Sequence, residues 1–194
     1  MKPVNMREDL VRHFQWLRRY GLNDSHSGNA SCRTATGMTI TPTGCCADAL
    51  CEEDLVDCPL DGSLPEGASI DAALHAAIYR SRPEVNAMLH SHGPYSIAVT
   101  MGDGDFHPPD FEGRYYFSQV PVVDIEYDRY REDSPIALGR VLRDCNVVIM
   151  RGHGVYACGE TIDLAYKWSC SLESSARLKW LRKPYHYQDD RKEQ

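Results

Sequence analysis

The segment Ala87-Met88-Leu89-His90-Ser91-His92 is a short apolar run that ends in two histidines one residue apart. A continuous apolar run of this length is typical of a strand buried within a sheet. A second such run, residues 146–150, leads into Arg151-Gly152-His153-Gly154, and a further strand-like stretch, 155–158, follows directly. The chain is therefore expected to contain a central sheet with histidines where two of its buried strands end.

Helical patterns flank this strand-rich middle. Asn5 followed by Glu8 forms a capping box, and apolar residues then recur at helical spacing up to Gly21. Further helices are predicted over 71–80, after Pro94, from Ser134-Pro135 onward and over 161–182. Strands are predicted over 29–33, 38–41, 55–60 and 119–124, and a long functional loop over 103–118. Because some strands are joined by hairpin-short connections, the fold class is α/β with a mixed sheet rather than a purely parallel one.

Length and composition limit the class of protein. With 194 residues, 42% hydrophobic and 25% charged, the chain is expected to form one domain over residues 1–194. No apolar run reaches the roughly 18–20 residues of a membrane span, and residues 1–8 lack a signal-peptide core, so a cytoplasmic protein without a membrane partner is expected. The net charge of −7 argues against a nucleic-acid partner but allows an anionic small substrate. The eight cysteines contain no C-x-x-C pair and are expected to be reduced thiols.

The histidines point to a metal site. His90 and His92 occupy alternate strand positions, so both imidazoles project from one face and can reach one point. His153 lies between Gly152 and Gly154, whose backbone freedom can aim its ring at the same point. Three neutral imidazoles leave one coordination position open, which is the pattern of a catalytic zinc site. A histidine pair alone is more often hydrogen-bonded in a core, so the third histidine carries this argument.

Other metal motifs do not fit the chain. It has no H-E-x-x-H sequence, and it lacks the H-x-E and P-C-x-x-C pairing of the zinc deaminases. Metal-dependent hydrolase barrels can also begin with H-x-H, but they need about 250 residues. A small all-β barrel with an H-x-H site is excluded by the helices predicted over 71–80 and 161–182.

An ordered set of motifs resembles a known family. The motifs are Ser27-Gly28-Asn29-Ala30-Ser31, Thr41-Pro42-Thr43-Gly44, the helix 71–80 with His75 and Tyr79, Arg82-Pro83, His90-Ser91-His92 and Arg151-Gly152-His153-Gly154. In this order they resemble the class II aldolase and adducin-head family, which includes fuculose-phosphate aldolases and ribulose-phosphate 4-epimerases. The resemblance covers roughly residues 5–180. It implies a single three-layer α/β/α domain with a central mixed, largely antiparallel sheet, usually assembled as a homotetramer with its sites at subunit interfaces.

The resemblance also implies a cofactor and a reaction. His90, His92 and His153 match the family's ligands for a divalent metal, most often Zn²⁺, with Mn²⁺, Co²⁺ or Fe²⁺ as alternatives. Such an ion acts as a Lewis acid for the enediolate formed when a carbon–carbon bond of a small keto-sugar breaks. The implied activity is that of an aldehyde-lyase, a class II aldolase, acting on a sugar or sugar phosphate in carbohydrate, including pentose, catabolism.

Five residues match the family's phosphate cradle. They are Gly28, Asn29, Thr43, Gly44 and Ser69. Small residues let backbone N–H groups approach a phosphate, and the hydroxyl and amide side chains add donors. Ordinary hairpin turns would explain the same residues without a ligand. The chain also departs from the family's usual Ser-Ser pair, because Ile70 follows Ser69, which admits a substrate that is not phosphorylated or that carries a carboxylate.

Asp71 stands where the family's aldolases have Glu and its epimerase-like members have Asp. Its carboxyl group is one methylene shorter, which displaces it by about an ångström from the position of a glutamate. The resemblance implies either a proton-transferring carboxylate or an acid close to the metal. Asp71 also suits the N-cap of the helix over 71–80, and the two roles are compatible.

Tyrosines and one further histidine complete the candidate residues. Tyr115 and Tyr116 lie where the family's aldolases supply a proton-donating tyrosine from the neighbouring subunit, and the alignment does not choose between them. Tyr185 and Tyr187 near the end of the chain are weaker candidates for closing the site. His75, one helical turn after Asp71, is expected to pack or to orient other groups rather than to act as a fourth ligand.

Alternative functions remain open at this stage. A 4-epimerase, or a decarboxylase of a keto-acid sugar, would use the same residues through the same enediolate. From a different class, a non-catalytic interaction module resembling the adducin head needs the fold but not the ligands. The presence of all three histidines and an acid favours an enzyme.

Overall fold

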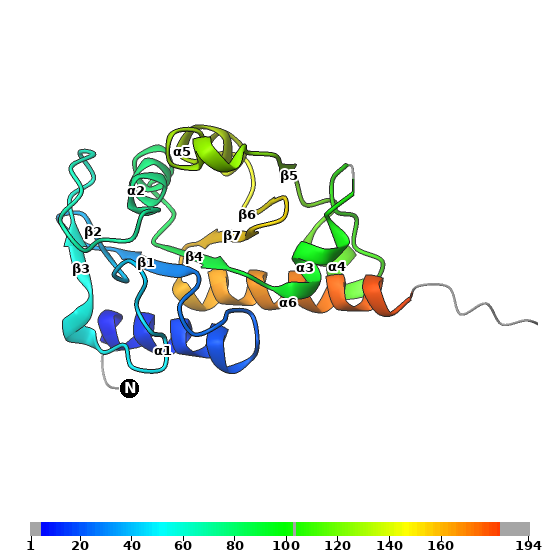
Figure 1. Cartoon of the computed structure of the whole chain (residues 1–194), viewed down its shortest axis with the longest axis horizontal. Coiled ribbons are helices and arrows are strands. Elements are labelled where there is room, and N and C mark those ends of the chain that lie inside the picture. The colour runs from blue at the N-terminus through cyan, green and yellow to red at the C-terminus, as the bar shows by residue number, and fades with distance from the viewer. Residues whose placement is uncertain (1–4, 103, 183–194) are drawn as a thin grey trace, which may run out of the picture.

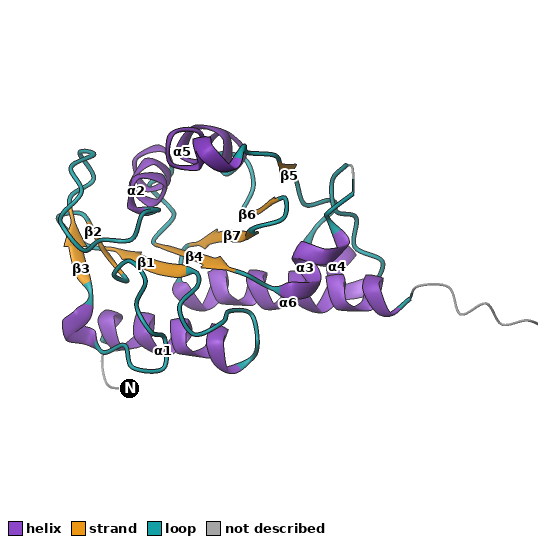
Figure 2. Ribbon diagram, viewed as in Figure 1, coloured by secondary structure: helices purple, strands orange, loops and turns teal. Residues whose placement is uncertain are grey.

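A seven-stranded sheet forms the middle layer of the computed structural model, which describes residues 5–102 and 104–182. The strands lie in the order β3-β2-β1-β4-β7-β6-β5 (Figure 2). Neighbouring strands are antiparallel except β5 and β6, which are parallel. The strand bounds are β1 (Asn29–Arg33), β2 (Met38–Ile40), β3 (Val56–Cys58), β4 (Ala87–Ser91), β5 (Val122–Val123), β6 (Val147–Met150) and β7 (Gly154–Gly159).

Helices cover both faces of the sheet. Figure 1 shows α2 (Ala72–Ser81) and α5 (Tyr130–Val141) on one face. The other face carries α1 (Met6–Arg19), α3 (Pro94–Val99), α4 (Phe111–Tyr116) and α6 (Ile162–Leu181). Two 3₁₀ turns complete the elements, η1 (Glu52–Asp54) and η2 (Tyr127–Arg129). These layers confirm the expected α/β/α fold with a mixed, largely antiparallel sheet.

Side chains along β4 alternate between the two faces of the sheet, and this alternation determines the face on which His90 lies. Met88 packs in the core beneath α2 and α5, whereas Ala87 and Leu89 pack in the core against α1 and α6. Because side chains of a strand alternate between the two faces, His90 projects to the same side as Met88. The imidazole therefore lies on the face that α2 and α5 cover.

Three local predictions were wrong. The predicted loop over 103–118 contains α4, whose N-cap Asp110 accepts a hydrogen bond from the Gly113 backbone amide at 3.0 Å. The strand predicted over 119–124 shrinks to β5, because Pro121 lacks an N–H for the ladder. The helix predicted to begin at Ser134-Pro135 begins earlier, at Tyr130, where an ion pair between Arg129 and Asp133 supports the first turn.

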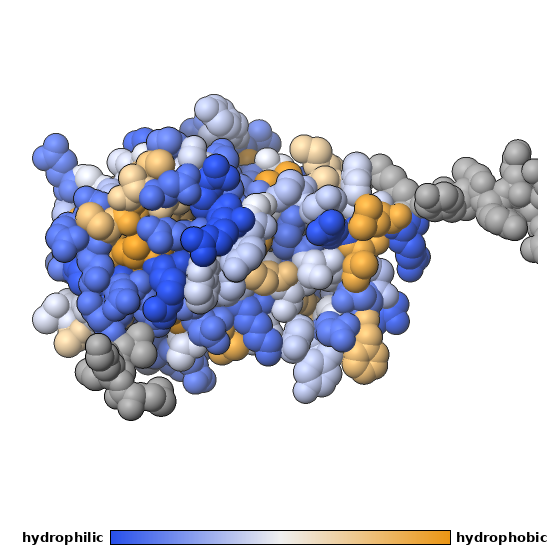
Figure 3. All heavy atoms as spheres, turned by 90° about the horizontal axis from the view of Figure 1, so that it is seen from below, coloured by the Kyte–Doolittle hydropathy of each residue, from blue (hydrophilic) through white to orange (hydrophobic). Residues whose placement is uncertain are grey.

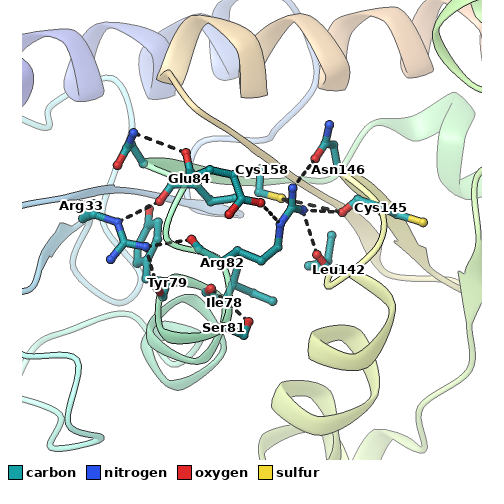
Figure 4. A network of polar contacts seen from close by, with 12 residues as sticks. Arg33, Ile78, Tyr79, Ser81, Arg82, Glu84, Leu142, Cys145, Asn146 and Cys158 are labelled. Carbon is teal, nitrogen blue, oxygen red and sulfur yellow. Dashed lines mark hydrogen bonds and ion pairs between the residues drawn. The ribbon is translucent and has the colours of Figure 1, made fainter.

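Two arginines join the end of α2 to β1 and to the loop before β6 (Figure 4). The Arg82 guanidinium donates to the carbonyl oxygens of Leu142 and Cys145, both at 2.9 Å, and to Asn146 Oδ1 at 3.0 Å. Arg33 donates to three further carbonyls, those of Tyr79, Arg82 and Val85.

All eight cysteines are free thiols. Among the described residues, no helix combines the length and the hydropathy needed to cross a membrane. On the face that carries α1 and α6, some hydrophobic side chains gather near the C-terminal end of the described chain (Figure 3). Exposed hydrophobic residues on α4 and α6 include Phe111, Leu178 and Leu181.

Candidate active site

Three imidazoles converge at one point on the α2–α5 face of the sheet. His90 comes from β4, His92 follows that strand, and His153 comes from the turn between β6 and β7. The Nε2 atom of His90 lies 2.9 Å from that of His92 and 3.1 Å from that of His153. Potential ligand atoms of all three residues lie within 4.8 Å of one another. The structure thus brings together the three predicted metal ligands.

Neighbouring groups orient the His90 ring and hold the backbone of His92. The Nδ1 atom of His90 lies 3.1 Å from the carbonyl oxygen of Val155, so Nδ1 carries the proton and Nε2 presents its lone pair to the cluster. The same ring stacks on Tyr156, with centroids 4.0 Å apart and planes 1° from parallel. The backbone amide of His92 donates to Asn23 Oδ1 at 2.8 Å, which holds the chain beyond β4 in place.

The glycines beside His153 have different tasks. Gly152 has φ +68°, a backbone conformation that favours glycine and turns the chain sharply before the histidine. Gly154 makes room, because a Cβ atom there would lie 2.8 Å from His90 Cε1 and 3.0 Å from His92 Cδ2. Only the first of these tasks is the turn that the sequence suggested.

The donor set fits a divalent cation. Burial lowers the pKa of His92 to about 4, and it also lowers the pKa values of His90 and His153, so all three rings are neutral near pH 7. Neutral imidazole is the form that binds a metal. Three nitrogen atoms placed about 2.0–2.1 Å from one tetrahedral ion would be about 3.3 Å apart, close to the Nε2 separations found here.

Asp71 lies beside the imidazoles with its carboxylate enclosed. The residue is 3% exposed, and although it occupies the N-cap position of α2, its side chain makes no capping hydrogen bond. Instead, Oδ2 accepts from Asn29 Nδ2 at 2.7 Å, and Oδ1 accepts from the Tyr130 hydroxyl at 2.5 Å. Burial acts to raise the pKa of Asp71, but nearby His90 and the Tyr130 hydrogen bond outweigh it and hold the pKa below its usual value.

Two tyrosines that the sequence patterns did not predict lie against this carboxylate. The Tyr156 hydroxyl lies 3.4 Å from Asp71 Oδ2 and 2.7 Å from the Tyr130 hydroxyl. Tyr156 pairs directly with His90 in the β4–β7 register, so a correct strand pairing would have identified it. Tyr130 has no comparable local signal, because it lies in a charged stretch where the helix start was misplaced.

The expected phosphate cradle lies in the same cavity as the histidines. A cavity of about 290 Å³ is lined by the three histidines, Asp71, Tyr130, Ile70 and all five cradle residues. The Thr43 amide already donates to the Gly67 carbonyl at 2.9 Å, so the hydroxyl of Thr43 is the group left for a ligand. Asn29 joins the cradle to the acid, because its side-chain amide donates to Asp71.

A second cavity adjoins the first on the side of α5. Its volume is about 590 Å³, and it shares Ile70, Tyr130 and His153 with the histidine cavity. Tyr127 and Met150 add apolar surface to it. The Ile70 side chain, 48% exposed, therefore lies at the boundary between the two cavities.

The other predicted residues lie away from the histidines or outside the described chain. Tyr115 on α4 is 77% exposed, and Tyr116 packs against Trp168 and beneath the Lys167 ammonium; neither lines the histidine cavity. His75 is fully buried at 2.7 Å from Ser31 Oγ and is not part of the cluster, in agreement with a packing role. Tyr185 and Tyr187 lie outside the residues that the structure describes.

Comparisons with known proteins agree with this architecture. The family model described as Class II Aldolase and Adducin N-terminal domain matches residues 8–180. L-fuculose phosphate aldolase of Methanococcus vannielii is 29% identical over 171 residues, which cover 87% of this chain and 91% of that protein. The 5-methylthioribulose-1-phosphate/5-deoxyribulose-1-phosphate aldolase of Escherichia coli is 28% identical over 188 residues, which cover 92% and 84%.

A solved structure gives the same result. The L-fuculose-1-phosphate aldolase of Thermus thermophilus matches with a TM-score of 0.86 and 29% identity, covering 94% of this chain and 97% of that one. The fold and these relatives define the class as an α/β lyase of the aldolase type. The chain belongs to the class II aldolase and adducin N-terminal domain family. The family, the fold class and the enzyme class expected from the sequence are thereby confirmed.

Proposed function

We propose that this protein is a divalent-metal-dependent aldehyde-lyase that cleaves or forms a carbon–carbon bond in a small keto-sugar phosphate. One observation carries the proposal: three Nε2 atoms, a buried carboxylate and an anion cradle face a single cavity. The sugar-phosphate aldolases among the relatives support the substrate class. The complete set of ligating side chains leaves the interaction-module alternative without a structural argument in its favour.

His90, His92 and His153 would hold the ion, with Zn²⁺ as the first choice and Mn²⁺, Co²⁺ or Fe²⁺ as alternatives. When bound, the metal supplies Lewis-acid polarisation of a carbonyl group. The Val155 carbonyl keeps the His90 imidazole in position for it, and Asn23 holds the backbone of His92.

The chain's own groups bind the substrate at both ends. The cradle residues Gly28, Asn29, Thr43, Gly44 and Ser69 would receive the phosphate, and Thr43 would do so through its hydroxyl. Asp71 would move a proton at the carbon beside the carbonyl. The part of the substrate released as an aldehyde would occupy the second cavity, where Ile70, Tyr127 and Met150 offer apolar contacts.

One observation favours 4-epimerisation as a second candidate function. Epimerisation begins with the same bond cleavage and then requires the aldehyde to turn before the bond forms again. The second cavity, at about 590 Å³, gives that fragment space beside His153.

The assembly and the location follow from the family resemblance. We propose a homotetramer whose sites lie at subunit interfaces, supported by the 81% exposed Phe111 and its neighbours on α4 and α6. Light scattering would give the mass of the assembly. A cytoplasmic location stays a prediction.

A substrate screen tests the proposed function. Protein loaded with Zn²⁺, Co²⁺ or Mn²⁺ is offered ketose 1-phosphates, free ketoses and keto-acid sugars, while aldehyde and carbon dioxide are measured. Aldehyde release that stops after chelation and returns with metal is the expected result. Carbon dioxide release, inversion without free aldehyde, or no turnover with any metal would contradict the aldolase proposal.

A further inference from the structure

The Asp71 carboxylate reaches the second cavity only through another side chain. Asp71 lines the histidine cavity but not the second cavity. Its Oδ1 atom is occupied by the Tyr130 hydroxyl at 2.5 Å. Any proton that passes between this carboxylate and a group bound in the second cavity must therefore pass along that hydrogen bond or through water.

Tyr130 is placed to make this connection. Tyr130 is the first residue of α5 and is only partly buried. Tyr130 lines both cavities, and the centroid of its ring lies 5.1 Å from the ring centroid of His153. The hydroxyl thus lies between the enclosed carboxylate and the space that adjoins the proposed metal ligands.

Tyr156 serves as a natural contrast to Tyr130. Its hydroxyl also contacts Asp71 and lies 2.7 Å from the Tyr130 hydroxyl. Tyr156 is fully buried beneath His90, however, and lines neither cavity. It can hold the carboxylate and the Tyr130 hydroxyl in place but cannot contact a substrate.

We propose that Tyr130 is a catalytic residue that relays a proton between the substrate hydroxyl and Asp71 during the cleavage proposed above, on which this inference rests. The substrate O–H proton passes to Tyr130 Oη while the Tyr130 proton passes to Asp71 Oδ1. The O–H electron pair forms the C=O bond of the aldehyde, and the carbon–carbon pair goes to the ketone fragment as an enediolate. Asp71 then returns its proton to that carbon, so both side chains are regenerated without a co-reactant.

This relay makes a specific claim about two tyrosines expected from the sequence. Tyr115 and Tyr116 are unnecessary for the oxygen proton, because Tyr130 of the same chain supplies a hydroxyl at the site. Within the described residues, Tyr130 is also the tyrosine that lines both cavities.

A partial reaction separates the two proton transfers. Dihydroxyacetone phosphate, the ketone half of a 1-phosphoketose cut between carbons 3 and 4, can exchange its carbon-bound proton with deuterated water. This exchange needs Asp71 but no aldehyde oxygen. Cleavage of L-fuculose 1-phosphate or 5-deoxyribulose 1-phosphate, whichever the wild-type protein accepts, needs both transfers.

The experiment compares Tyr130→Phe and Tyr156→Phe with the wild-type protein. We expect Tyr130→Phe to lower cleavage by about 10²–10⁴-fold, the range of a lost acid–base group, while exchange falls by less than about tenfold. We expect Tyr156→Phe to lower cleavage and exchange by the same, smaller factor, because it only positions the carboxylate. The absorption spectrum of bound Co²⁺ should be unchanged in both variants.

Three outcomes overturn the relay. Equal loss of cleavage and exchange in Tyr130→Phe would make Tyr130 a positioning residue only. Undiminished cleavage in Tyr130→Phe, or a Tyr115→Phe variant that loses cleavage and keeps exchange, would assign the oxygen proton elsewhere. Wild-type protein that catalyses neither exchange nor cleavage would instead refute the proposed function itself, which keeps the two failures distinguishable.

Discussion

The two ends of α2 carry two polar networks of opposite character. At the C-terminal end, the guanidinium of Arg82 is paired with carbonyl and side-chain oxygens from the loop before β6 and with Glu84 (Figure 4). At the N-terminal end, Asp71 accepts hydrogen bonds from three separate elements beside a cavity, and buried Asn29 Oδ1 has no hydrogen-bond partner within the described part of the chain. The saturated network stabilises the fold, whereas the unsaturated one keeps groups available for a ligand.

The largest expected effect comes from breaking the cluster at the N-terminal end of α2. His92→Ala removes one of three ligands, so we expect loss of bound metal and a fall in turnover of at least about 10³-fold, with little change in melting temperature. Metal analysis and activity on the screened substrate measure this. His107→Ala, an exposed histidine outside the site, is the control and should keep both. Full activity in His92→Ala would disprove the site.

Asp71→Asn tests whether the acid acts on protons or on the metal. The amide keeps the shape of the side chain but cannot accept a proton, so turnover should fall by about 10²–10⁴-fold while metal is retained. Equilibrium dialysis with Zn²⁺ measures how much metal the variant retains. Loss of metal from this variant would make Asp71 a ligand and would contradict the three-histidine arrangement.

Arg82→Met tests the opposite end of the helix. The substitution keeps most of the apolar stem but leaves the partly buried carbonyls of Leu142 and Cys145 without the Arg82 donor, which we expect to cost about 2–3 kcal/mol of unfolding free energy. Urea unfolding measures the loss, with Arg143→Met on the exposed surface as the control. Turnover per folded molecule should stay within about twofold of wild type. An Arg82→Met protein with wild-type unfolding free energy but reduced turnover would contradict the proposed difference between the two ends of α2.

The smallest effect is a dependence of stability on pH. Burial lowers the pKa of His75 to about 4 from the 6.5 expected in the unfolded chain. Between these two pKa values the His75 imidazole is protonated in the unfolded state but neutral in the folded state. The free energy of unfolding therefore falls as the pH drops from 6.5 toward 4. Between pH 7 and pH 5 this amounts to about 2 kcal/mol. Urea unfolding at both pH values should show a smaller pH difference in His75→Asn, whatever its absolute stability. An unchanged difference would contradict this prediction.

Local patterns predicted the parts of the molecule that depend on short-range rules. The i, i+2 spacing of His90 and His92 places them together once β4 is a strand, and the glycines beside His153 mark a turn. The α/β class follows from apolar periodicity and short connections. The motif singled out Asp71, which lines the same cavity as the histidines. Its surroundings depend on Asn29 and Tyr130, which come from distant elements.

Tyr130 shows why the rest of the site could not be predicted. Its position depends on where α5 begins, and the Ser134-Pro135 pair offered a strong but misleading start signal. Packing of α5 on the sheet, together with the local ion pair of Arg129 with Asp133, determines the start instead, and that packing is not visible in a window of sequence. The helix α4 was missed for a similar reason, because its Asp110 cap lies in a segment rich in Gly and Pro.

The pairing of His90 with Tyr156 across β4 and β7 ties assembly of the proposed metal site to the folding of the chain. A slip of one residue between these strands would turn the His90 imidazole toward α1 and α6, away from its two partners. The ligands come from segments separated by 63 positions between His90 and His153, so no local fragment can assemble the triad. We therefore expect the chain to bind a divalent cation late in refolding, after the central strands have paired in their native register. The time at which binding begins would then report when that register forms.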